Sequence, residues 1–186
     1  FGSPPIWPGL ERRITQAWHD VRNYARDVLS GAREDVERAG TLFAAIAGLR
    51  DEVDIVAYDM ADGPHRAAGV RSAMLALVEI VQQVRLLSLL ERGDPLAVTI
   101  RGQCLVALDG NRSDALAFLT TLRDDELSRP DATVAAIGQI QQALRCVESM
   151  TQLEDGLLSL REGSEPARDV RLPHRKEFFF ALQNAI

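Results

Sequence analysis

The residue types that most often carry chemistry are few and scattered in this sequence of 186 residues, which has three histidines and two cysteines. The nearest approach to a helical metal-ligand pair is Asp62-x-x-His65, but a Gly-Pro step between the two residues prevents them from sharing one helical face. His19 and His174 lie far away in the chain. The Glu-x-x-His pairs that di-iron bundles place on facing helices are absent from the sequence. We therefore predict no metal and no cofactor.

The two cysteines, Cys104 and Cys146, each lie in a helical pattern and have no CxxC partner. A catalytic cysteine needs a base and an orienting group, and neither cysteine has a histidine nearby in the sequence. The glycine motifs of nucleotide-binding loops and of hydrolase nucleophile elbows are also absent. We predict that the protein is not an enzyme and that both cysteines are small buried apolar residues in a reducing compartment. An enzyme would require the fold to bring a histidine to one of these thiols.

The charge is acidic overall, with a formal net charge of -6 and a pI of about 5.1. A broad nucleic-acid surface needs clustered Lys and Arg, so we predict no nucleic-acid partner. Three acidic groups could bind a cation, although solvated helix faces explain them more simply. They are Glu34-Asp35-Glu37, Asp51-Glu52-Asp54 and Asp124-Asp125-Glu126.

The elements that must position these residues are predicted to be helices. Aromatic residues make up only 5% of the chain, so Leu, Ala, Val and Ile must fill the core, a mixture that favours helix over strand. Apolar residues recur at alternating spacings of three and four, the period of one helical face. Asp94 and Ser113 stand where helix caps are expected. The pattern predicts helices at about 8–29, 33–61, 64–90, 94–108, 113–127 and 134–160.

The fold class predicted from this pattern is all-α, an antiparallel bundle of about six helices, several of them long. Short breaks such as Asp62-Gly63-Pro64 force long helices to fold back on their neighbours. The helix after that break has the widest apolar face, so we expect it to be the most buried. No stretch of the chain has the roughly 20 consecutive apolar residues of a typical membrane helix. The chain lacks a signal peptide pattern and begins without Met, so we expect a soluble piece of a longer protein.

The segment 166–186 differs in character, because a basic cluster is followed by apolar and aromatic residues. This pattern fits a docking helix for the bundle, and it fits equally the first turn of a membrane span. In the second of these two readings, the central residues of the segment form a membrane junction. They are His174, Arg175, Lys176, Phe178, Phe179 and Phe180.

This segment, Leu172-Pro-His-Arg-Lys-Glu-Phe-Phe-Phe-Ala-Leu-Gln-Asn-Ala-Ile186, resembles the junction that enters the second membrane block of the fusaric acid resistance (FUSC) family of aromatic acid exporters. The upstream region is similar as well, with a Pro-rich start, a Tyr24-Ala25 step and long helices of Leu and Ala. The resemblance covers the whole chain. It implies a cytoplasmic helical bundle at 1–165 between two membrane blocks, and a linker at 166–186 that leads into a transmembrane segment.

What the resemblance implies is a domain of an inner-membrane efflux transporter for small aromatic or organic acids, serving assembly, gating or substrate delivery. Its expected partners are the membrane domain of the same polypeptide, a second copy of the chain in a homo-oligomer, and a small aromatic or organic acid. Basic residues near both ends, Arg12 and Arg13 and then Arg168 to Lys176, fit a cytoplasmic placement. The alternative from the helical pattern alone is a ligand-sensing or adaptor bundle of a regulatory protein.

Overall fold

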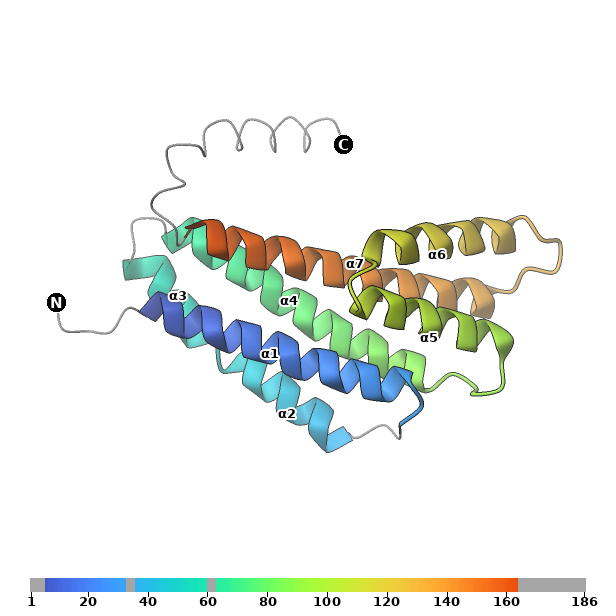
Figure 1. The fold of residues 1–186 in the computed structure, drawn as a ribbon, viewed down its shortest axis with the longest axis horizontal. Coiled ribbons are helices and arrows are strands. Elements are labelled where there is room, and N and C mark those ends of the chain that lie inside the picture. Colours follow the sequence, from blue (N-terminus) through green and yellow to red (C-terminus); the bar gives the residue numbers. More distant parts are fainter. Residues whose placement is uncertain (1–5, 33–35, 60–62, 164–186) are drawn as a thin grey trace, which may run out of the picture.

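Seven α-helices make up the part of the chain that the computed structural model describes, residues 6–32, 36–59 and 63–163 (Figure 1). No strand occurs in these ranges, so the predicted all-α class is confirmed. The helices are α1 (Ile6–Leu29), α2 (Val36–Ala47), α3 (Arg50–Asp59), α4 (Gly63–Ser88), α5 (Pro95–Leu108), α6 (Arg112–Leu127) and α7 (Val134–Gly163).

The bundle is arranged around α4. This helix packs against α1, α2 and α3, and it makes its most extensive contact with α7. The shorter helices α5 and α6 form a hairpin against α7, and α5 also contacts α1. Figure 1 shows that the chain reverses direction between successive helices, except that α3 continues in the direction of α2. The predicted antiparallel bundle is therefore observed. The helix expected to be the most buried, α4, does not differ from α1 and α7 in its share of buried residues.

The second predicted helix was expected to be continuous, and this expectation is wrong. It is divided into α2 and α3 at Gly48 and Leu49. The amide of Gly48 still donates to the carbonyl of Ala44 at 2.9 Å, but that of Leu49 donates to Ile46, only three residues back, at 3.2 Å. Glycine has little helix propensity, which allows this local tightening. The apolar stripe continues across the break, since Ile46, Leu49 and Val53 are all buried.

The predicted cap of α5 is confirmed, and the predicted cap of α6 is wrong by two residues. The side chain of Asp94 caps α5 by accepting a hydrogen bond from the amide of Leu96 at 3.1 Å. Ser113 does not cap α6, because the helix already begins at Arg112 and Asn111 occupies the cap position. Among the described residues the Asn111 side chain makes no cap hydrogen bond.

Two glycines reverse the chain where the sequence predicts turns. Gly31, after α1, has a φ of 106°, and Gly110, between α5 and α6, has a φ of 108°. Both values lie in the left-handed region that side chains with a Cβ disfavour. The turn at Gly110 separates α5, which contacts α1, from α6, which packs on α5 and α7.

The core follows the predicted stripes, with exceptions on their flanks. Val70, Leu77 and Val84 of α4 are completely buried, whereas Leu75 and Leu89, which flank the same stripe, are 67% and 74% exposed. One helical segment among the described residues, Pro64–Ser88, is long and apolar enough to cross a membrane by length and composition. Half of its most apolar window is buried inside the bundle.

Candidate functional site

The six residues predicted to form a membrane junction, His174, Arg175, Lys176, Phe178, Phe179 and Phe180, lie outside the described residues. So does the whole predicted linker 166–186. The structure therefore describes the predicted bundle as far as Gly163, and the candidate sites considered below lie within it.

The two cysteines are brought together by the packing of α5 on α7. Cys104 and Cys146 are both free and completely buried, and the Sγ of Cys104 lies 4.0 Å from the carbonyl oxygen of Ala143. A hydrogen bond with Cys104, together with burial, raises the pKa of the Cys146 thiol well above its ordinary value of 9.0. This environment stabilises the protonated, unreactive form of the thiol.

The histidines of the described residues lie elsewhere. His19 is exposed on α1, where its Nε2 lies 3.2 Å from the side-chain nitrogen of Asn23, and His65 is exposed near the start of α4. No group of three or more His, Cys, Asp or Glu side chains among the described residues could hold a metal ion. The acidic group around Asp51 is divided between ion pairs, because Glu52 pairs with Arg13 and Asp54 pairs with Arg71.

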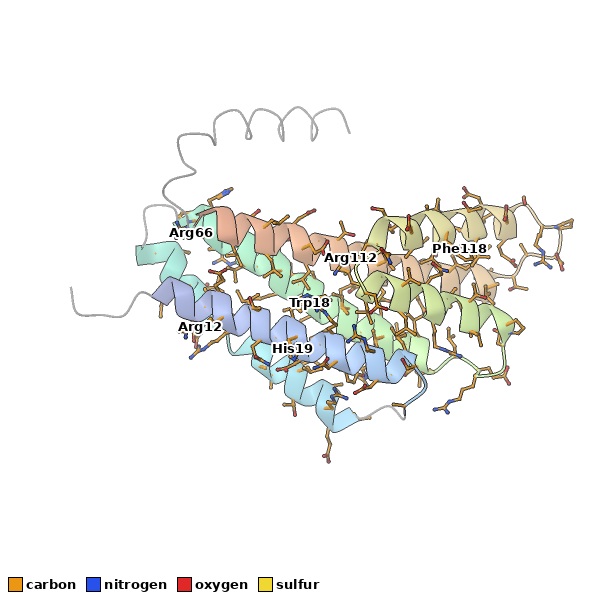
Figure 2. The ribbon with its side chains drawn as sticks, in the orientation of Figure 1. Arg12, Trp18, His19, Arg66, Arg112 and Phe118 are labelled. Atoms are coloured by element: carbon orange, nitrogen blue, oxygen red, sulfur yellow. The ribbon has the colours of Figure 1, made fainter. Side chains whose placement is uncertain are left out.

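An arginine cluster, which sequence reasoning missed, joins α1, α6 and α7. Arg112 has a side chain only 10% exposed and forms an ion pair with Glu154 at 2.5 Å. The guanidinium of Arg22 stacks on the ring of Trp18 at 4.7 Å. The pKa of Arg22 is lowered, first by burial and then by the positive charges of Arg112 and Arg26. Figure 2 shows Trp18 and Arg112 near the middle of the bundle.

The Arg112–Glu154 ion pair holds the start of α6 against α7. Trp18 is buried in the core. The spacing of Trp18, Arg22 and Arg26 places them on one face of α1. No local spacing shows that Arg112 and Glu154, which are distant in the chain, meet them there.

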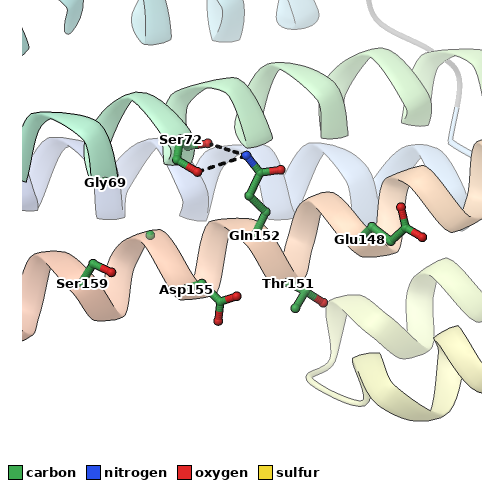
Figure 3. A pocket seen from close by; sticks show the side chains of 8 residues that line it. Gly69, Ser72, Glu148, Thr151, Gln152, Asp155 and Ser159 are labelled. Carbon is green, nitrogen blue, oxygen red and sulfur yellow. Dashed lines mark hydrogen bonds between the residues drawn. The ribbon is translucent and has the colours of Figure 1, made fainter. Parts of the chain in front are cut away.

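One surface hollow, of about 410 Å³, lies along the crossing of α4 and α7 (Figure 3). The side-chain amide of Gln152 on α7 joins the two helices. Its Nε2 donates to the hydroxyl oxygen of Ser72 at 3.1 Å and to the backbone carbonyl oxygen of Ser72 at 3.3 Å. Glu148 and Asp155 line the same hollow. Its carboxylates make it unfavourable for an anionic ligand.

A second hollow, of about 360 Å³, lies where α2 and α3 meet α4. We call it the α2–α4 pocket. Its wall is largely apolar, and three charged residues, Arg50, Asp54 and Arg71, also line it. Arg71 donates to Asp54 at 3.1 Å. Because the pocket spans the break at Gly48, a continuous helical pattern does not predict it. Its apolar lining consists of Phe43, Ile46, Ala47, Val53, Met74, Leu75 and Val78.

No protein-family model, curated protein or solved structure matches this chain.

Proposed function

We propose that this chain is the helical domain of an inner-membrane exporter of the FUSC type, which lies on the cytoplasmic side and serves assembly, gating or substrate delivery during efflux of small aromatic or organic acids. The observation that carries the proposal is the basic and then aromatic segment Leu172 to Ile186, which resembles the entry to a membrane block of that family. The membrane domain of the same polypeptide and further copies of the chain are the proposed partners.

The path of the chain through the bundle supports this proposal. Figure 1 shows that α1 begins and α7 ends at the same end of the long axis. A bundle whose entry and exit lie at one end can be inserted between two membrane segments without a long return connection. Arg12 and Arg66 lie toward that same end in Figure 2, where positive charge favours the cytoplasmic face of a membrane.

A pair of topology reporters tests the placement. Green fluorescent protein and alkaline phosphatase are each fused after Gly163 in the full-length parent protein, because the first is active only in the cytoplasm and the second only in the periplasm. We expect fluorescence without phosphatase activity. Phosphatase activity without fluorescence would refute the cytoplasmic placement.

A deletion tests the transport role. Residues 6–163 are replaced in the parent protein by a short flexible linker. A short linker is sufficient because α1 begins and α7 ends at the same end of the bundle. We expect the shortened protein to reach the membrane and to lose the tolerance to aromatic acids that the intact gene gives. Unchanged tolerance, with the shortened protein present at normal amounts, would refute a role for this domain in efflux.

A ligand-sensing bundle is the second candidate, and the α2–α4 pocket is the observation that favours it. A regulatory protein of this kind would bind its ligand without a membrane domain. Fractionation of cells that express the parent gene separates the two candidates, because the exporter stays with the membrane after a carbonate wash and the sensor does not.

A further inference from the structure

The α2–α4 pocket combines exposed apolar surface with an excess of positive charge. Its volume of about 360 Å³ falls at the low end of the range typical of small-molecule sites. Leu75 is 67% exposed, and Phe43, Met74 and Val78 are only partly buried. The helices α2, α3 and α4 thus leave an apolar concavity that their own side chains do not fill.

The charged residues of the pocket favour an anion. Arg50 and Arg71 supply two positive charges and Asp54 supplies one negative charge. The Arg71 and Asp54 side chains are 52% and 61% exposed, and ion pairs in such a setting contribute little to stability. Arg71 can therefore exchange this partner for a ligand carboxylate, which a guanidinium binds through two parallel hydrogen bonds.

We propose that the α2–α4 pocket binds a small monocarboxylic acid. Its apolar body packs against Met74, Leu75 and Val78, and its carboxylate binds Arg71 in competition with Asp54. The role of this site in efflux rests on the proposed function. If that function is right, the pocket is the place where a transported acid contacts this domain. The hollow between α4 and α7 is a poor competitor, because Glu148 and Asp155 line it.

Titration calorimetry on the 186-residue chain tests the proposal with 2-naphthoate as the probe and 2-naphthylmethanol as its neutral analogue. We expect saturable binding of the carboxylate and at least about tenfold weaker binding of the alcohol, since a charge-assisted bidentate contact is lost. Equal affinity for the two probes would overturn the proposal, and so would the absence of saturable binding of the carboxylate.

Four variants locate the site. Arg71→Gln is expected to weaken 2-naphthoate binding about tenfold, and Leu75→Trp is expected to abolish it by filling the cavity. Asp54→Asn is expected to tighten binding about threefold or more, because the competing carboxylate is removed. Arg145→Gln, an exposed change of the same charge on α7, is the matched control and should leave affinity unchanged.

The Asp54→Asn result is decisive, since a merely structural role for the ion pair predicts no gain in affinity. Equal weakening by Arg71→Gln and Arg145→Gln would also overturn the site. Thermal unfolding followed by circular dichroism checks that each variant is folded, which is expected because all the substituted side chains are largely exposed.

If these binding tests fail while the deletion of 6–163 still abolishes tolerance, only the site is wrong. If 2-naphthoate binds as expected but the fusions show phosphatase activity without fluorescence, only the proposed cytoplasmic placement is wrong.

Discussion

The two sides of α4 are packed in different ways. Toward α7, the backbones themselves approach, because a Cβ added at Gly156 would lie 3.1 Å from the carbonyl oxygen of Gly69 and 3.2 Å from the Cβ of Ala73. Toward α2 and α3, large side chains such as Phe43 and Met74 separate the helices and leave the α2–α4 pocket. One side of the central helix is therefore closed by small residues, and the other is held open by bulky ones.

The two sides of α4 are therefore expected to differ in rigidity. Backbones in van der Waals contact leave no room for repacking between the two helices, and the hollow of about 410 Å³ on this side lies at the surface beside the crossing. The α4–α7 crossing also carries the Gln152–Ser72 hydrogen bonds, while the α2–α3 side contains a helix break. We infer that α4 and α7 form a rigid frame and that the α2–α3 side is the adaptable part.

Thiol reactivity should give the largest contrast, between the α5–α7 interface and the α2–α4 pocket. Cys104 and Cys146 lie buried between α5 and α7, so their reaction with Ellman's reagent requires the bundle to open. We expect reaction at least about 1,000-fold slower in the native protein than in denaturant, as a stability of several kcal/mol implies. Ala47→Cys in a background with both native cysteines changed to Ala is the control. This exposed pocket position should react rapidly, and equal rates at the native and introduced thiols would contradict the comparison.

The same thiols predict a dependence of stability on pH. The pKa of Cys146 is raised in the folded state, so the folded protein favours the protonated thiol more than the unfolded chain does. The resulting stabilisation is fully present below the ordinary thiol pKa of 9.0 and is lost as the pH rises above it. Urea unfolding at pH 8 and pH 10 should show a larger loss of stability for the native protein than for Cys146→Ala. An equal loss in the two proteins would contradict this prediction.

Gly156→Leu should strongly destabilise the tightly packed side. The new side chain meets the backbone of Gly69 and Ala73, which cannot rotate away, so the helices must separate. We expect a loss of about 3 kcal/mol in the free energy of unfolding by urea. Gly138→Leu in the same helix is the control, since a Cβ there has no neighbour within 4 Å among the described atoms, and it should be tolerated. Similar losses for the two variants would mean that the crossing is not tightly packed.

Glu154→Gln should have a smaller effect on the arginine cluster. It leaves the side chain of Arg112, which is 10% exposed, beside Arg22 without its carboxylate partner. Since Glu154 is 47% exposed, we expect a loss of about 1–2 kcal/mol in urea unfolding, below that of a fully buried pair. Adding Arg112→Met to Glu154→Gln should restore most of the lost stability, because the unpaired charge is removed as well. Asp27→Asn, which removes the ion pair between Asp27 (54% exposed) and Arg38 (37% exposed), is the control and should change stability little.

The sequence predicted the elements better than their contacts. Helices and their buried stripes follow from spacing alone, and the stripe of α4 is indeed buried at positions such as Leu77 and Val84. The wide apolar face of that helix was expected to be buried, but Leu75 and Leu89 are exposed, because exposure depends on which neighbours cover a face. Val134, the first residue of the helix predicted at 134–160, is 90% exposed.

Local sequence patterns did not predict the arginine cluster or the α2–α4 pocket, because both depend on contacts between helices. The arginine cluster joins α1, α6 and α7, and the α2–α4 pocket joins three helices, so neither has a spacing that a single segment reveals. The junction residues around Phe179 were identified from resemblance, and that assignment stays a prediction.

Gly48→Ala should have the smallest effect and tests whether the break on the adaptable side needs glycine. Gly48 does not have a positive φ, and an added Cβ would lie 3.4 Å from the nearest atom, the carbonyl oxygen of Ala44. Alanine is therefore compatible with the break, and its higher helix propensity should stabilise the protein by about 0.5 kcal/mol. Gly40→Ala in α2 is the control, because its Cβ has no neighbour within 4 Å among the described atoms. A loss of stability at Gly48 together with a gain at Gly40 would show that the break is held under strain. An equal gain at both would show that packing of Leu49 and Val53 on the core, rather than glycine itself, maintains the break beside the pocket.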